Sequence, residues 1–127
     1  MSETVQEPAK PTPELLLKAV TETLEDRLAE DIVVINLSGK STIADYMVIA
    51  SGRSTRQSQS TAERITRALT EAGLKILGVE GERDGNWILI DAGSVVVHLF
   101  HQPVREFYEI EKLYGDAPCI EINVTPE

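Results

Sequence analysis

The side chains most able to do chemistry in this sequence are its aspartates and its two histidines. Two-metal phosphoryl transfer needs converging carboxylates, usually from an Asp-x-Asp strand and one further acid, and no Asp-x-Asp occurs in the chain. Asp84 and Asp91 are separated by a predicted strand, and nothing in the pattern brings them together. His98 and His101 lie at a strand end, where their odd spacing points the two rings to opposite faces. We therefore predict no catalytic residues, no metal site and no cofactor.

Three residues are better suited to recognising a protein partner. Trp87, the only tryptophan, is either a packed strand residue or an interface anchor, since an indole offers a large apolar area and one N–H donor. Asp91 is either a turn residue whose carboxylate bonds the following backbone or an ion-pair partner for a basic protein. His98 is either hydrogen-bonded near the sheet surface or placed beside a partner-binding surface. These alternatives stay open at the level of sequence.

The charge balance indicates which class of partner to expect. The chain carries 21 acidic and 12 basic residues, a net charge of −9, whereas proteins that bind a phosphate backbone normally present a basic surface. A basic protein is the better expectation, because long-range attraction speeds encounter with it. Acidic and aromatic residues between 106 and 116 form either a solvated face or a complementary patch. Four arginines are either solvated or an auxiliary RNA contact (Arg53, Arg56, Arg64 and Arg67).

Bulk properties are typical of one domain in a reducing compartment. The 127 residues, 42% of them apolar, suffice for a single packed core. No segment approaches the roughly 18 consecutive apolar residues of a membrane span, and Cys119, the only cysteine, allows no internal disulfide. We expect a disordered tail over 1–12, one domain over 13–124 and a cytoplasmic location.

Hydrophobic periodicity predicts three helices and a set of short strands. Leucine and valine recur every four residues after Thr12-Pro13-Glu14, the pattern of a capped amphipathic helix. Ser54 or Thr55 caps a second helix that Gly73 ends, and Pro103 opens a third. The predicted helices are about 13–29, 55–72 and 103–114, and the predicted strands are 32–37, 46–50, 74–79, 87–90, 95–100 and 119–124.

Helices that alternate with short strands predict an α/β fold with a single mixed β-sheet flanked by helices. The strands at 87–90 and 95–100 are expected to form a hairpin. Gly93 suits the left-handed last position of a three-residue loop, which we favour over a two-residue Ala92-Gly93 loop that would need Ala92 at positive φ. On that register Ile88 and Ile90 share a face with His98, and a slip of one residue would reverse the grouping.

Two stretches carry a resemblance to a known family. Residues 39–57 read GKSTIADYMVIASGRSTRQ, and residues 78–100 contain GVEGE and WILIDAGSVVVHLF. The match continues through 105–108 (REFY) and 114–118 (YGDAP). On these motifs the chain resembles the Iojap, or ribosomal silencing factor, family over roughly 14–118. Tyr114 is a departure, because the family more often has tryptophan there.

The resemblance implies a protein without catalytic activity that binds ribosomal protein fourteen, a basic protein at the intersubunit face of the large ribosomal subunit. Such a protein blocks joining of the small subunit when nutrients are scarce. The resemblance also implies a fold similar to nucleotidyltransferases without their catalytic carboxylates, and some family members form homodimers. It favours the interface interpretation of the tryptophan. We accordingly predict seven partner-binding residues: Trp87, Asp91, His98, Arg105, Tyr108, Glu109 and Asp116.

The alternative function is a nucleotide-binding or nucleotidyltransferase-type enzyme. It is suggested by Gly52-Arg53-Ser54, which resembles the Gly-Ser turn that holds a triphosphate in such enzymes.

Overall fold

A computed structural model describes residues 12–37, 44–101 and 119–122. The predictions for the N-terminal tail before residue 12 and for the third helix lie outside these residues. The elements are α1 (Pro13–Asp26), β1 (Glu30–Asn36), β2 (Tyr46–Gly52), α2 (Thr55–Glu71), β3 (Gly78–Glu80), β4 (Trp87–Asp91), β5 (Val95–His101) and β6 (Cys119–Ile122).

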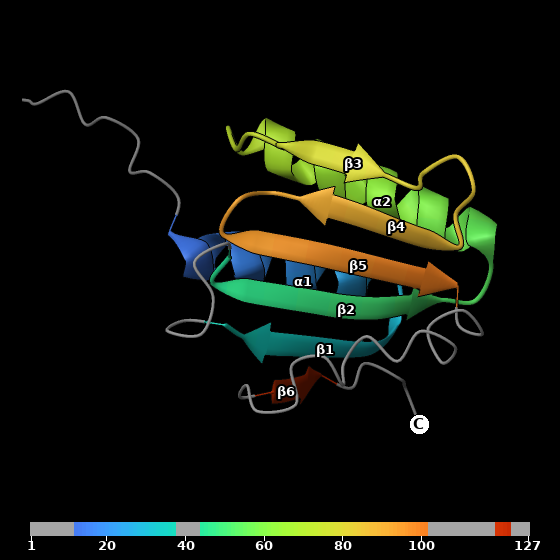
Figure 1. Cartoon of the computed structure of the whole chain (residues 1–127), viewed down its shortest axis with the longest axis horizontal. Coiled ribbons are helices and arrows are strands. Elements are labelled where there is room, and N and C mark those ends of the chain that lie inside the picture. The colour runs from blue at the N-terminus through green and yellow to red at the C-terminus, as the bar shows by residue number, and fades with distance from the viewer. Residues whose placement is uncertain (1–11, 38–43, 102–118, 123–127) are drawn as a thin grey trace, which may run out of the picture.

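The strands form one mixed sheet in the order β3-β4-β5-β2-β1-β6. β2 and β5 pair in parallel at its centre, and the other neighbouring pairs are antiparallel. Figure 1 shows α1 and α2 side by side behind the same face of the sheet. The predicted single-domain α/β fold with a mixed sheet is thus confirmed. In the part of the chain that the structure describes, neither helix is long and apolar enough to cross a membrane.

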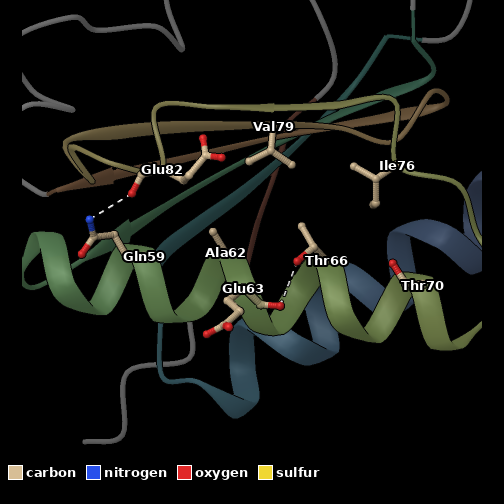
Figure 2. Close-up of a pocket in the computed structure, with 8 residues that line it drawn as sticks. All are labelled: Gln59, Ala62, Glu63, Thr66, Thr70, Ile76, Val79 and Glu82. Atoms are coloured by element: carbon tan, nitrogen blue, oxygen red, sulfur yellow. Dashed lines mark hydrogen bonds between the residues drawn. The ribbon is translucent and has the colours of Figure 1, made fainter.

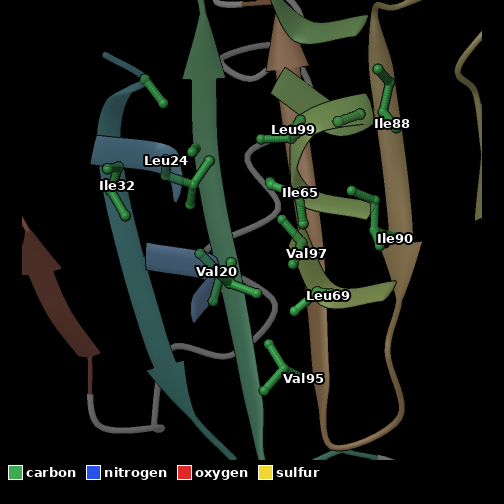
Figure 3. Packing of buried hydrophobic residues seen from close by; sticks show 14 of the residues in the cluster. Val20, Leu24, Ile32, Ile65, Leu69, Ile88, Ile90, Val95, Val97 and Leu99 are labelled. Atoms are coloured by element: carbon green, nitrogen blue, oxygen red, sulfur yellow. The ribbon is translucent and has the colours of Figure 1, made fainter. Parts of the chain in front are cut away.

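The main core lies between the two helices and the sheet (Figure 3). The helices contribute one buried stripe each, spaced at three or four residues as an amphipathic helix requires. The strands contribute alternate residues, because successive side chains in a strand point to opposite faces. The fully buried members include Val20, Leu24, Ile32, Ile65, Leu69, Ile88, Ile90, Val95 and Val97.

The predicted starts of the first two helices are confirmed by side-chain caps. Thr12 Oγ1 accepts a hydrogen bond from the Leu15 amide at 3.1 Å, and Ser54 Oγ accepts one from the Gln57 amide at 3.0 Å. Gly73, at φ +83°, ends α2 as predicted, with the Leu74 amide bonded to the carbonyl of Leu69.

The first helix ends earlier than predicted. α1 stops at Asp26, whereas its apolar pattern suggested a helix to about residue 29. The Ala29 amide bonds back to the carbonyl of Leu24, and Leu28 stands at φ +60°. This is the same type of helix end as that of α2, but it uses a leucine in the left-handed position. The sequence pattern did not predict this helix end because leucine, and not glycine, occupies the left-handed position.

The hairpin exists, but its predicted three-residue loop is wrong. Ile88 pairs with Leu99 and Ile90 with Val97, and the Ala92 amide bonds to the Val95 carbonyl at 3.0 Å. The loop is therefore Gly93-Ser94, with Gly93 at φ +86° in the first central position, as a type II′ turn requires. This register puts Ile88 and Ile90 on the helix-covered face with three other apolar strand residues. The predicted register would have placed a histidine ring under the helices instead.

The predicted strand over 74–79 is also wrong in extent. Only Gly78–Glu80 pair, and the register with β4 ends where Gly78 meets Asp91. Beyond Asp91 the neighbouring chain turns into the hairpin loop, so residues before Leu77 have no ladder partner on β4. The ladder therefore stops where β4 ends.

Candidate protein-binding site

The second face of the sheet is the one that neither α1 nor α2 covers. β1 and β2 place a cluster of buried apolar residues on it, and β5 adds Phe100. Trp87 and Val96 pack against this cluster and are only half-buried. The sheet therefore has an apolar layer on both faces, and at Trp87 and Val96 the second face is partly exposed.

Three rings form an aromatic cluster on the second face: Trp87, which is half-buried, and His98 and Phe100, which are buried. Trp87 and Phe100 face each other across the β4–β5 ladder, with ring centroids 5.0 Å apart and an interplanar angle of 29°. His98 lies almost parallel to Phe100, at 12° and 6.2 Å. The indole Nε1–H of Trp87 donates a hydrogen bond to His98 Nδ1 at 3.0 Å. The predicted hydrogen-bonded strand histidine is thus present, and its donor is the predicted anchor.

His98 is a neutral ring at physiological pH. It is 7% exposed, and burial lowers the pKa of His98 from 6.5 to about 4 because a buried imidazolium loses its hydration. A neutral imidazole carries one proton, so the acceptor role of Nδ1 places that proton on Nε2. The hydrogen bond and the low pKa therefore support the same protonation state.

Acid is expected to destabilise the fold through this residue. In the unfolded chain the pKa of His98 is near 6.5, and in the fold it is about 4, so the unfolded state takes up the proton first. The stability contributed by neutral His98 is complete above about pH 6.5 and is lost as the pH falls from there through 4. At pH 4 the loss is about 3 kcal/mol. Urea unfolding at pH 7 and pH 4 measures the loss.

His98→Phe is the matched variant for that measurement, because it keeps a buried ring and leaves every carboxylate in place. The wild-type chain should lose more stability on acidification than the variant. Equal losses in the two proteins would mean that carboxylates alone account for the acid sensitivity.

Asp91 acts as a turn residue, one of its two predicted roles. Its Oδ1 accepts a hydrogen bond from the Gly93 amide at 2.9 Å, which stabilises the hairpin loop. Only one carboxylate oxygen takes part in this contact, and the residue is half-exposed. The turn role is compatible with an ion pair to a partner, which stays a prediction.

Sequence reasoning missed two neighbours of the aromatic cluster. Leu89 lies between Trp87 and Asp91 on the same face of β4, and Glu80 lies opposite Leu89 on β3. Leu89 could have been found from the alternation of side chains along β4. Glu80 could not, because its place depends on how β3 pairs.

The other predicted partner-binding residues have no structural test. Arg105, Tyr108, Glu109 and Asp116 lie outside the described residues, so of the seven only the three from β4 and β5 are placed. Those three lie together on the second face.

The helix-covered side carries a separate groove of about 540 Å³ between α2 and the β3 region (Figure 2). Gln59 Nε2 donates to the carbonyls of Glu82 and Arg83, both at 2.9 Å, and so ties the β3–β4 connection to the helix. Ala62, Ile76 and Val79 provide the apolar lining. Trp87, Asp91 and His98, the three predicted site residues that the structure describes, do not line this groove.

The basic side chains of α2, and Arg53 just before it, are partly engaged within the chain. Arg53 Nε bonds Glu30 Oε2 at 2.8 Å, and Arg67 lies 3.6 Å from Glu63. Arg56 and Arg64 are exposed on the same helix.

The sequence model of one protein family, described as "ribosomal silencing factor during starvation", matches residues 9–127. The ribosomal silencing factor of Zymomonas mobilis is 47% identical over 103 residues, which cover 81% of this chain and 77% of that protein. The mouse protein named mitochondrial assembly of ribosomal large subunit protein 1 is 33% identical, over 72% of this chain and 41% of its own length. A crystal structure of a Chromobacterium violaceum protein superposes with a TM-score of 0.80 at 38% identity, covering 82% of this chain and 87% of that one.

Proposed function

The chain belongs to the ribosomal silencing factor family, and from this we propose that it binds the large ribosomal subunit through ribosomal protein fourteen. By occupying the intersubunit surface it keeps the small subunit from joining and represses translation in the cytoplasm when nutrients are limiting. The mechanism is steric and needs no catalysis. The large subunit as target is supported by the mouse relative, whose name refers to assembly of that subunit.

The observation that carries the proposal is an accessible surface of aromatic and apolar side chains with acids at its edge. We define the docking face as Glu80, Trp87, Leu89, Asp91 and Val96, which share the second face across β3, β4 and β5. Specific interfaces combine an apolar centre with a polar rim. Two carboxylates at the rim and a net charge of −9 favour a basic partner, because complementary charge steers the encounter.

The contacts of the Gly52-Arg53-Ser54 turn weigh against the alternative of a nucleotide-binding enzyme. A triphosphate at this helix start would need its free amides and a basic side chain. Here Gln57 Oε1 accepts from the Arg53 amide at 2.7 Å, and Ser54 Oγ accepts from the Gln57 amide. The Arg53 guanidinium is paired with Glu30.

The positions of the aspartates also argue against a nucleotide-binding enzyme. Asp84 and Asp91 stand at opposite ends of β4, and Asp84 accepts a hydrogen bond from Asn86. Within 12–37 and 44–101, no three His, Cys, Asp or Glu side chains converge to hold a metal ion.

Contact of α2 with ribosomal RNA is an auxiliary part of the proposal. The contribution of this contact to the binding free energy is limited, because Arg53 and Arg67 already have carboxylate partners in the chain. Most of the binding energy is assigned to the docking face.

Sucrose-gradient sedimentation tests the proposal directly. The protein should move with isolated large subunits and reduce formation of whole ribosomes when small subunits are added. Binding should weaken only partly as salt rises from about 0.05 to 0.2 M. A loss on the order of 10³ over that range would indicate phosphate-backbone binding instead.

Nucleotide binding in the presence of magnesium is the parallel measurement. Nucleotide affinity without movement on the gradient would favour the enzyme.

Asp91→Asn separates the charge of Asp91 from its turn role, since the amide oxygen can still accept from Gly93. This variant should associate more slowly at low salt and keep its stability.

A further inference from the structure

We propose that His98 is a positioning residue for Trp87: its Nδ1 holds the indole in one orientation on the docking face, and His98 itself makes no contact with the partner. The inference rests on the proposed function for its consequence in binding. The positioning itself is a property of the free chain.

The register makes the contact a diagonal one. Trp87 is directly opposite Phe100, and His98 is directly opposite Leu89, so the indole must reach across the ladder to meet the imidazole. Stacking on Phe100 restrains the plane of the indole, with centroids 5.0 Å apart. Stacking alone does not choose between the two ring orientations related by rotation about the Cβ–Cγ bond, because that torsion has a broad, roughly two-fold preference. The 3.0 Å hydrogen bond to Nδ1 selects one of them.

The difference in burial shows which of the two rings can contact a partner and which can only hydrogen-bond within the chain. His98 is 7% exposed, whereas Trp87 is half-buried on the same face. The imidazole is therefore poorly placed to touch a partner, and the indole is accessible to one. Since the indole N–H has an acceptor within the chain, the partner recognises Trp87 mainly through its ring surface. This revises the expectation that the N–H would be the polar handle of the anchor.

An acceptor at Nδ1 requires neutral His98. Burial lowers the pKa of His98 to about 4, which keeps the lone pair available at physiological pH. No charged side chain stands among its ring contacts, which are Trp87 and Phe100 in the described chain. On β3 and β4, the acidic residues that share this face are Glu80 and Asp91; on β6, Glu121 lies opposite Val33 of the second face.

Two substitutions separate the hydrogen bond from the packing. His98→Phe keeps an aromatic ring beside Phe100 and removes the acceptor. His98→Asn loses the ring but offers Oδ1 close to the former place of Nδ1. A merely structural role predicts that phenylalanine is the milder change, and the positioning role predicts that asparagine is.

Trp87 is the only tryptophan in the chain, so NMR of the ¹⁵N-labelled protein shows one indole N–H signal to follow. In the wild-type protein this proton should exchange slowly with solvent. In His98→Phe its signal should shift and its exchange should speed up about tenfold or more, and His98→Asn should largely restore both. Fast exchange in the wild-type protein, or equal spectra in wild type and His98→Phe, would overturn the proposal without any variant having to bind.

Affinity for the large subunit completes the test. His98→Phe should bind about tenfold to a hundredfold more weakly, because docking would bury an indole N–H that has lost its acceptor, and His98→Asn should recover most of the loss. Unchanged binding by a folded His98→Phe would show that the orientation of Trp87 does not matter to the partner. If the wild-type chain itself does not bind the large subunit, the proposed function is wrong. The NMR result still decides whether His98 positions Trp87.

Discussion

Replacing Trp87 with alanine should weaken binding to the large ribosomal subunit about thirtyfold or more. Truncation of an aromatic anchor at the centre of an interface typically costs about 2 kcal/mol or more, which corresponds to that factor. The loss should appear mainly as faster dissociation, because interface truncations act largely on the off-rate. Cosedimentation at several protein concentrations, with dissociation followed on immobilised subunits, measures both quantities.

Stability is the necessary companion measurement, since Trp87 also packs within the chain. The substitution removes the stack on Phe100 and the hydrogen bond to His98, each worth on the order of 1 kcal/mol. A decrease of about 2 kcal/mol in the free energy of unfolding is therefore expected, and the chain should remain folded.

Leu15→Ala is the matched control. Leu15 is 56% exposed and lies on α1, on the opposite side of the sheet, so its truncation removes accessible apolar area away from the docking face. Its binding should equal that of the wild type. Normal cosedimentation of a folded Trp87→Ala protein would remove Trp87 from the interface, and outright unfolding would assign it to the core.

The second large effect is expected at Gly81. Alanine there should lower the free energy of unfolding by about 2–5 kcal/mol. Gly81 has φ +83°, and an added Cβ would lie 2.1 Å from the carbonyl oxygen of Trp87. The left-handed conformation costs a non-glycine residue about 1–2 kcal/mol, and overpacking against a backbone atom adds about 1–3 kcal/mol. Relief would require the start of β4 to move, and with it the anchor.

Gly73→Ala isolates the conformational part of this cost. Gly73 has the same φ of +83°, and an added Cβ there would meet nothing within 4 Å. Its loss should be about 1–2 kcal/mol. Urea unfolding of both variants gives the difference, which reports the clash alone. Equal losses would mean that the turn at Gly81 adapts without disturbing β4.

Local signals were enough to predict α1, α2 and most of the described strands. The caps at Thr12 and Ser54 and the stop at Gly73 depend on residues within a few positions of each other. Such contacts form in any context, so they can be read from the chain. The end of α1 escaped because Leu28 adopts a conformation that leucine rarely takes.

The residues of the candidate site could be proposed one by one from the sequence, but the surface that they share could not. Trp87, Asp91 and His98 were identified from their types and from the family motif, and the structure places all three on one face. Their partners within the chain were not predictable. The acceptor of the indole N–H depends on a diagonal contact across two strands, and Glu80 joins the face only through the pairing of β3.

By itself, the sequence determined the family, the α/β class, the acidic charge and the helix boundaries set by caps. The family follows from its sequence motifs. The fold class, the charge and the helix boundaries follow from periodicity, composition and short-range hydrogen bonding, which do not depend on the rest of the fold. The tertiary structure alone decided the hairpin register and therefore which face carries His98. The reason is that a shift of one residue exchanges the two faces of a strand, and the choice is made by burying Ile88, Ile90, Val95 and Val97 under helices that are distant in sequence.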